Sequence, residues 1–124
     1  FNTHLDHVSE EARIKGIGVV LDKIAQFGSL PAMIMGDFNV EEDTETYRSA
    51  TENFLDVKYQ TKDPIKSCTY QNWGERLDDD CIDYIMISKT GFRVNSYNVV
   101  RTTYDGVYPS DHFPITASLT LTQG

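Results

Sequence analysis

The chain has 124 residues, of which 40% are hydrophobic and 24% charged, and its formal net charge is −8. This length fits one domain with a modest core, and no apolar run is long enough to cross a bilayer. The acidic balance argues against a non-specific nucleic-acid binder, but it does not exclude an enzyme that acts on phosphates, because a bound divalent cation reverses the local field.

The first third of the sequence predicts a strand followed by a helix. Residues 1–6 are typical of the end of a strand. Ser9 is suited to cap a helix, and Glu10 and Glu11 suit its positive N-terminal end. The apolar residues that follow form one stripe at helical spacing: Ile17, Val20, Leu21, Ile24 and Phe27. Gly28 is a suitable end for this helix.

The rest of the sequence predicts mainly strands. Residues 32–35 form an apolar run, which is typical of a strand buried on both faces. A short helix is expected over residues 44–53. Further strands are expected over residues 67–71, 81–88, 92–100 and 114–122, with a hairpin-like turn at 89–91.

This order of elements predicts a layered α/β fold, with one mostly antiparallel mixed sheet and helices on one of its faces. The opposite face of that sheet would be apolar, and no part of the chain remains to cover it. The two cysteines, Cys68 and Cys81, match no metal-binding spacing. They are either bridged across a hairpin or are two small core residues.

Asp37 and Asn39 form the first candidate site. They straddle Phe38 where a strand passes into a loop, and residues two apart on an extended chain point the same way. A carboxylate and an amide in that arrangement can ligate Mg²⁺ and position an attacking water. The sequence Gly-Asp-x-Asn also suits an Asx turn, so both interpretations remain open.

Asp83 is the second candidate, because it lies in the apolar strand 82–87, where an unpaired carboxylate is costly. His112 is its best partner, since an aspartate orients an imidazole and favours its protonated form. The alternative is an aspartate that caps a loop. Asp111, beside His112, is either a metal ligand, an orienting group or a solvated turn acid.

Three further side chains complete the candidate set. His4 shares a strand face with Asn2 and is therefore preferred over His7. Trp73 lies in a turn-like stretch and either lines a substrate groove or folds over the core. The acidic run 78–80 is interpreted as a solvated loop.

Four of these stretches together resemble the endonuclease/exonuclease/phosphatase superfamily, the fold of pancreatic deoxyribonuclease and the abasic-site endonucleases. The matching stretches are Asn2 to His7, Gly36 to Asn39, Cys81 to Ser88 and Pro109 to Ile115. The resemblance covers nearly the whole chain and implies the C-terminal half of a four-layer α/β/β/α sandwich. On this view residues 1–124 are that half, and the N-terminal half is absent from the chain.

The resemblance also implies a divalent-metal-dependent phosphoesterase, with Mg²⁺ or Mn²⁺ as its cofactor. The implied roles are phosphate contact by His4, water activation by Asp37, water or phosphoryl binding by Asn39, orientation of His112 by Asp83, transition-state stabilisation by His112, and a site wall that includes Asn2. The implied metal-binding residues are Asp37, Asn39 and Asp111. The substrate is a nucleic acid, a phospholipid headgroup or a small phosphate ester.

Members of the superfamily also carry an asparagine and a metal-ligating glutamate in their N-terminal half, and no residue of this chain corresponds to them. We therefore expect weak metal binding and little activity from these residues alone. The apolar sheet face is expected to pair with the N-terminal half or with a second copy of the chain. The alternative function is a truncated, non-catalytic binding or structural module of the same fold.

Overall fold

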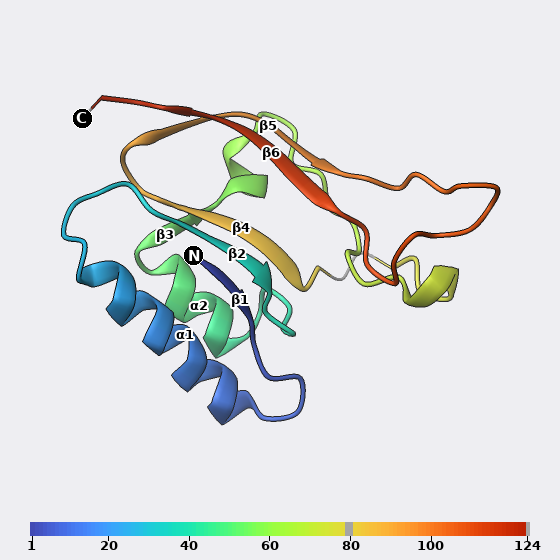
Figure 1. Ribbon diagram of the computed structural model, residues 1–124, viewed down its shortest axis with the longest axis horizontal. Helices are drawn as coiled ribbons and strands as arrows, with labels where there is room; N and C mark the ends of the chain where they lie inside the picture. Colours follow the sequence, from blue (N-terminus) through green and yellow to red (C-terminus); the bar gives the residue numbers. More distant parts are fainter. Residues whose placement is uncertain (79–80, 124) are drawn as a thin grey trace.

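The computed structural model describes residues 1–78 and 81–123, and these residues form helices and strands in the order shown in Figure 1. The elements are β1 (Asn2–His4), α1 (Glu10–Ala25), β2 (Met33–Asp37), α2 (Glu45–Thr51), β3 (Phe54–Asp56), η1 (Val57–Gln60), η2 (Asn72–Gly74), β4 (Asp83–Ser88), β5 (Phe92–Val99) and β6 (Ile115–Leu121). No helix among the described residues is long and apolar enough to span a membrane.

Helix α1 begins as the sequence predicts. The Ser9 hydroxyl accepts a hydrogen bond from the Ala12 amide at 3.2 Å, which satisfies one of the unpaired donors of the first turn. Ile17 and Ile24 are buried beneath the helix, so the predicted apolar stripe is confirmed at these positions. Phe27 is 58% exposed and lies beyond the last helical residue, so its assignment to the stripe is wrong.

Strands β1, β2, β4 and β3 form, in that order, the main sheet. β1 runs parallel to β2, and β4 is antiparallel to both β2 and β3. The register pairs His4 with Asp37 and Asp37 with Asp83, which brings three residues that are distant in sequence to one end of the sheet. Helices α1 and α2 cover one face of this sheet, below it in Figure 1.

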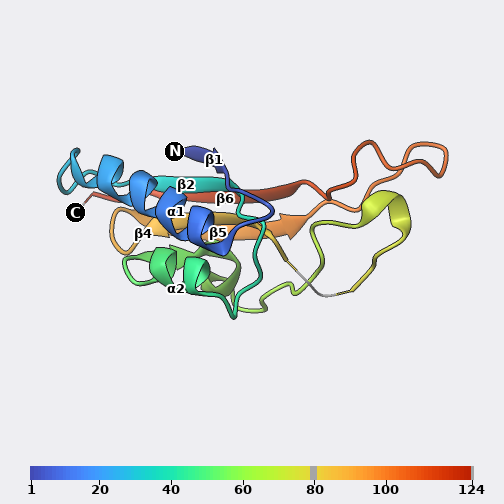
Figure 2. The same ribbon diagram turned by 90° about the horizontal axis from the view of Figure 1, so that it is seen from below.

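Strands β5 and β6 form a separate two-stranded antiparallel sheet, the hairpin sheet. It packs on the face of the main sheet that is opposite the helices, as Figures 1 and 2 show. The core between the two sheets includes Ile85 and Ile87 from β4 and Tyr97 from β5. The α/β class is therefore confirmed, while the strands fall into two sheets rather than one. The expectation that nothing in the chain covers the far face is wrong.

Three local predictions also fail. Residues 67–71 are not a strand, and the third strand of the chain is instead β3, which the sequence did not indicate. The turn at 89–91 leads from the main sheet into the hairpin sheet, so β4 and β5 do not form a hairpin. Met35 is 37% exposed, so β2 is not buried on both faces. Of the acidic run 78–80, residues 79 and 80 lie outside the described residues.

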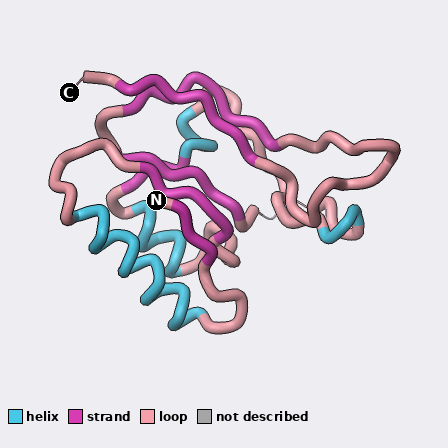
Figure 3. The backbone as a smooth tube through the Cα atoms, in the orientation of Figure 1, coloured by secondary structure: helices cyan, strands magenta, loops and turns pink. Residues whose placement is uncertain are grey.

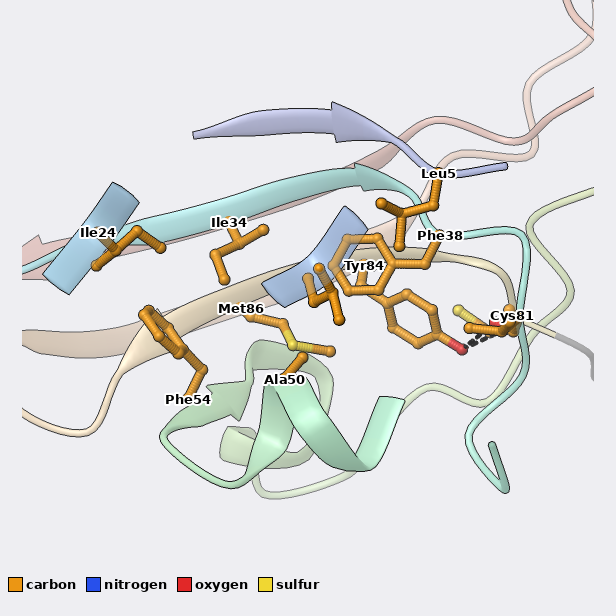
Figure 4. Packing of buried hydrophobic residues seen from close by; sticks show 11 residues of the cluster. Leu5, Ile24, Ile34, Phe38, Ala50, Phe54, Cys81, Tyr84 and Met86 are labelled. Carbon is orange, nitrogen blue, oxygen red and sulfur yellow. Dashed lines mark hydrogen bonds between the residues drawn. The ribbon is translucent and has the colours of Figure 1, made fainter. Parts of the chain in front are cut away.

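The core beneath the helices anchors the loops at the end of the main sheet. Tyr84 packs against Phe38, with ring centroids 5.1 Å apart, and both side chains are fully buried. The Tyr84 hydroxyl lies near the carbonyl oxygens of Val40 and Cys81, at 2.8 and 2.6 Å (Figure 4). Tyr84 therefore ties the loop after β2 to the segment before β4. Cys68 and Cys81 are buried and not bridged, as the core interpretation expects.

A buried ion cluster lies next to this core. The ammonium group of Lys58, whose side chain is 3% exposed, contacts a carboxylate oxygen of Glu42 and lies 4.0 Å from a carboxylate oxygen of Asp56. The cluster borders a pocket of about 350 Å³ that also includes Lys66 and Cys81. A charge this deeply buried is tolerated only because it is paired.

At the opposite end from the chain termini, the molecule consists largely of loops and the turn η2 (Figure 3). The segment that carries His112 returns from these loops toward the main sheet, where an isolated bridge joins Tyr70 to His112. This return brings His112 to the edge where β1, β2 and β4 present their polar residues.

Candidate active site

Asp37 is at the centre of the candidate site. It is the last residue of β2, and its carboxylate oxygen Oδ2 lies 3.4 Å from Nε2 of His4 and 3.7 Å from Nε2 of His112. The Asp37 side chain is 14% exposed, whereas that of His4 is 74% exposed. One carboxylate oxygen thus faces two imidazole rings, from β1 and from the segment before β6.

The other carboxylate oxygen of Asp37 has a local structural role. Oδ1 accepts a hydrogen bond from the Asn39 amide at 2.8 Å, which is an Asx turn. Asn39 adopts a left-handed backbone, with φ of 53°, and its side-chain Nδ2 donates to the Leu5 carbonyl at 2.7 Å. The two interpretations of the Asp37–Asn39 motif are therefore compatible, because the turn occupies Oδ1 and leaves Oδ2 toward the histidines.

His112 is held by Asp83 as well as facing Asp37. Its Nδ1 lies 2.8 Å from Oδ2 of Asp83, the first residue of β4, so the predicted pair is brought together. The Tyr70 ring packs against the imidazole at a centroid distance of 5.2 Å. The hydrogen bond to Asp83 orients the ring so that Nε2 points to the Asp37 side.

The environment shifts the pKa of both central groups upward. Burial tends to lower the pKa of the His112 imidazole, but the hydrogen bond and negative charge of Asp83, together with Asp37, raise it above its ordinary value. Burial raises the pKa of the Asp37 carboxyl, and the negative charge of Asp83 adds to this, while the Asn39 amide partly opposes it. These shifts favour the protonated form of the His112 imidazole and make the Asp37 carboxylate more basic.

The donor set fits a divalent cation. Asp37, Asp83 and His112 each offer a ligand atom, and these atoms lie within 4.8 Å of one another. Two carboxylates that repel each other in a partly buried site are stabilised by a cation, and Mg²⁺ is commonly bound through one or two carboxylates with water completing its shell. Within the described residues, Asp111 is not part of this cluster.

The remaining predicted site residues are Asn2, Asp111 and Trp73. Asn2 is exposed on β1 and shares a strand face with His4, while Thr3 between them points to the other face. The Asp111 carbonyl accepts hydrogen bonds from the Gln71 and Asn72 amides at 2.8 and 3.1 Å, so this residue fixes the loop that precedes His112. Trp73 is 60% exposed, which argues against its assignment to the core.

The sequence did not indicate the residues that support the site from behind. Thr69 and Gln71 are fully buried, and their hydrogen bonds run to β4 and to the segment that carries His112. They lie in a stretch whose composition is typical of a strand. The only signal was the alternation of polar side chains at Ser67, Thr69 and Gln71, which a strand buried in a core would not favour.

The site thus consists of a carboxylate between two histidines, one of which is paired with a second carboxylate, at the end of a two-sheet α/β fold. Such a group of residues suits metal-assisted hydrolysis of a phosphoester. Comparison with known proteins agrees. The family model described as "Endonuclease/Exonuclease/phosphatase family" matches residues 2–112, and this chain belongs to that family.

Two solved structures of similar proteins come from Bacteroides thetaiotaomicron. An endonuclease/exonuclease/phosphatase family protein from Bacteroides thetaiotaomicron is 28% identical, with a TM-score of 0.85, and the match covers 99% of this chain and 49% of that one. The mannosyl-6-phosphatase Bt3783 from the same species is 27% identical, with a TM-score of 0.80, and the match covers 98% and 50%.

Human nocturnin is 27% identical over an alignment that covers 83% of this chain and 27% of nocturnin. The chain therefore spans about a quarter of this curated relative and about half the length of the bacterial structures. These comparisons identify the family as one whose members include phosphatases and nucleases.

Proposed function

We propose that this chain provides the water-activating and transition-state-stabilising residues of a divalent-metal-dependent phosphoesterase. The observation that carries the proposal is the position of one Asp37 oxygen between the Nε2 atoms of His4 and His112, at 3.4 and 3.7 Å. A phosphoryl group needs an oriented water on one side and positive charge around its equatorial oxygens. This arrangement has groups for both purposes within one site.

Each residue has a distinct role in the proposal. Asp37 accepts a proton from the attacking water, and its raised pKa makes it a stronger base near neutral pH. His112, held by Asp83 and favoured in its protonated form, donates from Nε2 to a phosphoryl oxygen as negative charge develops. The exposed His4 contacts the phosphate. Asn39, whose Nδ2 donates one N–H to the Leu5 carbonyl, holds the water through its side-chain carbonyl or a phosphoryl oxygen through its second N–H.

A divalent cation, when bound, would polarise the phosphoryl group and neutralise its charge. Asp37 is the residue of this chain best suited to hold it, with Asn39 and Asp111 as the further candidates from the sequence. The mutual repulsion of Asp37 and Asp83 supports such a role, because a cation relieves it. Mg²⁺ or Mn²⁺ suits these oxygen ligands.

We also propose that a further polypeptide segment completes the site. The chain covers 49% and 50% of the two bacterial structures, and the asparagine and glutamate that the family resemblance implies have no counterpart here. Residues of the inner face of the hairpin sheet, including Val94, Ile115 and Leu119, are only partly buried, which leaves apolar surface for that segment. Residues 1–124 alone are then expected to hydrolyse substrate weakly or not at all.

A phosphorylated sugar is the substrate we would examine first. The mannosyl-6-phosphatase with a TM-score of 0.80 supports this choice, and the net charge of −8 favours a small ester over a polyanion. Trp73, exposed near the turn η2, is then a candidate for contact with the sugar or with another leaving group. Nucleic acid and phospholipid headgroups are the competing substrates.

The test compares residues 1–124 with the full-length gene product on mannose 6-phosphate, single-stranded DNA, sphingomyelin and a generic aryl phosphate. Wild type and His112→Ala are measured side by side, with Asp22→Asn, an exposed position on α1, as the control. We expect hydrolysis of one of these esters by the full-length product and a loss of at least about a hundredfold in His112→Ala. Equal rates for wild type and His112→Ala would contradict the assignment, and no hydrolysis of any ester would favour the non-catalytic module.

A further inference from the structure

A buried segment behind the site, Thr69–Gln71, touches both members of the Asp83–His112 pair. Thr69 and Gln71 are fully buried although both are polar. Between them, Tyr70 forms an isolated bridge with His112. This segment belongs to neither sheet, so its hydrogen bonds to β4 and to the His112 segment are not part of a strand ladder.

The Thr69 hydroxyl replaces a missing strand partner at the start of β4. It accepts hydrogen bonds from the amides of Ile82 and Asp83, at 3.0 and 3.1 Å. β3 pairs with β4 only as far as Met86, so no strand among the described residues lies beside Asp83 on that side. A buried amide without an acceptor is costly, and Thr69 therefore fixes the backbone from which the Asp83 carboxylate projects.

The main chain of the same residue holds the other member of the pair. The Thr69 carbonyl accepts from the amide of Phe113, the residue after His112, at 2.6 Å. Gln71 continues the contact, because its Nε2 donates to the Ser110 carbonyl at 2.5 Å and its amide donates to the Asp111 carbonyl at 2.8 Å. The segment thus binds the His112 backbone on both sides.

We propose that Thr69 is a positioning residue that sets the Asp83–His112 hydrogen bond. The Thr69 side chain accepts a hydrogen bond from the backbone of Asp83, and the Thr69 carbonyl accepts one from Phe113, the residue after His112. One residue therefore connects the two segments that carry the pair. Hydrogen bonds weaken steeply with small displacements, and a catalytic arrangement tolerates only about 0.5 Å. The consequence for catalysis rests on the proposed function, whereas the positional claim does not.

The test replaces the hydroxyl with a methyl group of similar size in the full chain. In Thr69→Val we expect amide exchange of Ile82 and Asp83 to become at least about tenfold faster, because their acceptor is lost. We expect the His112 Nδ1–H resonance to shift or broaden in NMR spectra. Thr69→Ser, which keeps the hydroxyl, is expected to restore both signals.

A matched control exists in the same protein. Thr46 is also fully buried, and its hydroxyl has no hydrogen-bond partner within residues 1–78 and 81–123, so Thr46→Val makes the same chemical change without breaking a bond there. It is expected to leave the His112 resonance and the two amides unchanged. Gln71→Met is a second test variant, expected to disturb the His112 resonance while leaving the protection of the Asp83 amide intact.

The NMR readouts decide the proposal whether or not a substrate is found. If Thr69→Val retains wild-type exchange at Ile82 and Asp83 and an unchanged His112 resonance, the proposal is wrong. If Thr69→Val fails to fold, an unchanged His112 resonance in Gln71→Met contradicts it instead. With a substrate in hand, Thr69→Val is expected to lower kcat at least about tenfold with little change in KM, because orientation and not binding is lost.

Discussion

Replacing Asp83 with asparagine is expected to destabilise the protein at pH 5.5 and to have little effect at pH 9. Asp83 raises the pKa of His112 in the folded state above the ordinary value of an unfolded histidine. The stabilisation is therefore fully present below the unfolded-state pKa and is lost as the pH rises through the folded-state pKa. Asparagine keeps the size of the side chain but removes the charge that favours the imidazolium.

The magnitude follows from the geometry of the pair. At the nitrogen–oxygen separation of 2.8 Å, two unit charges attract by about 1.5 kcal/mol even at the dielectric constant of water. Charged hydrogen bonds contribute about 1.5–3 kcal/mol, and the side chains of His112 and Asp83 remain 28% and 17% exposed, which favours the lower end. We expect a loss of about 1–2 kcal/mol at pH 5.5. Above the folded-state pKa of His112 the imidazole loses its charge, and the relief of repulsion with Asp37 is then expected to make the substitution neutral or slightly stabilising at pH 9.

Urea denaturation at the two pH values measures this difference. With an m-value of about 2 kcal/mol per molar, the midpoint of Asp83→Asn should fall by about 0.5–1 M at pH 5.5 and should hardly move at pH 9. Asp22→Asn is the control, because Asp22 is exposed on α1. An equal shift at both pH values, or a larger one at pH 9, would refute the role assigned to the charge of His112.

Three other substitutions or modifications examine the fold around the site. Gly36→Ala is expected to destabilise the protein by more than about 3 kcal/mol in thermal unfolding, because the new Cβ would lie 1.7 Å from the Thr3 carbonyl oxygen of β1 at a φ of +144°. Gly18→Ala, which has open space around the new Cβ, should be neutral or stabilising. A Gly36→Ala variant as stable as wild type would contradict the β1–β2 pairing. Lys58→Met is expected to cost about 3–5 kcal/mol, because it leaves the buried Asp56 carboxylate and the partly exposed Glu42 carboxylate without a cation. Lys66→Met, at an exposed position of the same pocket, should have little effect. Burial raises the pKa of Cys81 to about 11, so iodoacetamide should not modify it at pH 8 until the protein unfolds, and rapid native-state labelling would contradict this burial.

The sequence predicted the two helices, because each begins at a capping residue that acts within its own first turn. Ser9 caps α1, and Thr44 accepts from the Tyr47 amide at the start of α2, within the region predicted as a short helix. The pairing of Asp83 with His112 was also predictable, because a carboxylate in an apolar strand needs a partner and few histidines were available. These inferences required only propensity, spacing and the cost of burying charge.

The errors concern interactions between distant segments. Alternation along β5 and β6 indicates strands but not the sheet to which they belong, so the two-sheet packing was not predictable from periodicity. The stretch 67–71 has strand-like composition, yet its polar groups bind β4 and the segment before β6 instead of a neighbouring strand. The Asx turn at Asp37 was left open for a similar reason, since the sequence does not specify which carboxylate oxygen faces the site.

The central claim is that Asp37, with His112, forms a metal-dependent site for phosphoester hydrolysis. The most direct measurement is the hydrolysis rate of the full-length gene product in Mg²⁺, in EDTA, and after Mg²⁺ is restored, for wild type and for Asp37→Ala. We expect wild-type activity to be lost in EDTA and recovered with Mg²⁺, and Asp37→Ala to be inactive throughout. Hydrolysis that persists in EDTA, or an Asp37→Ala variant as active as wild type, would contradict the account.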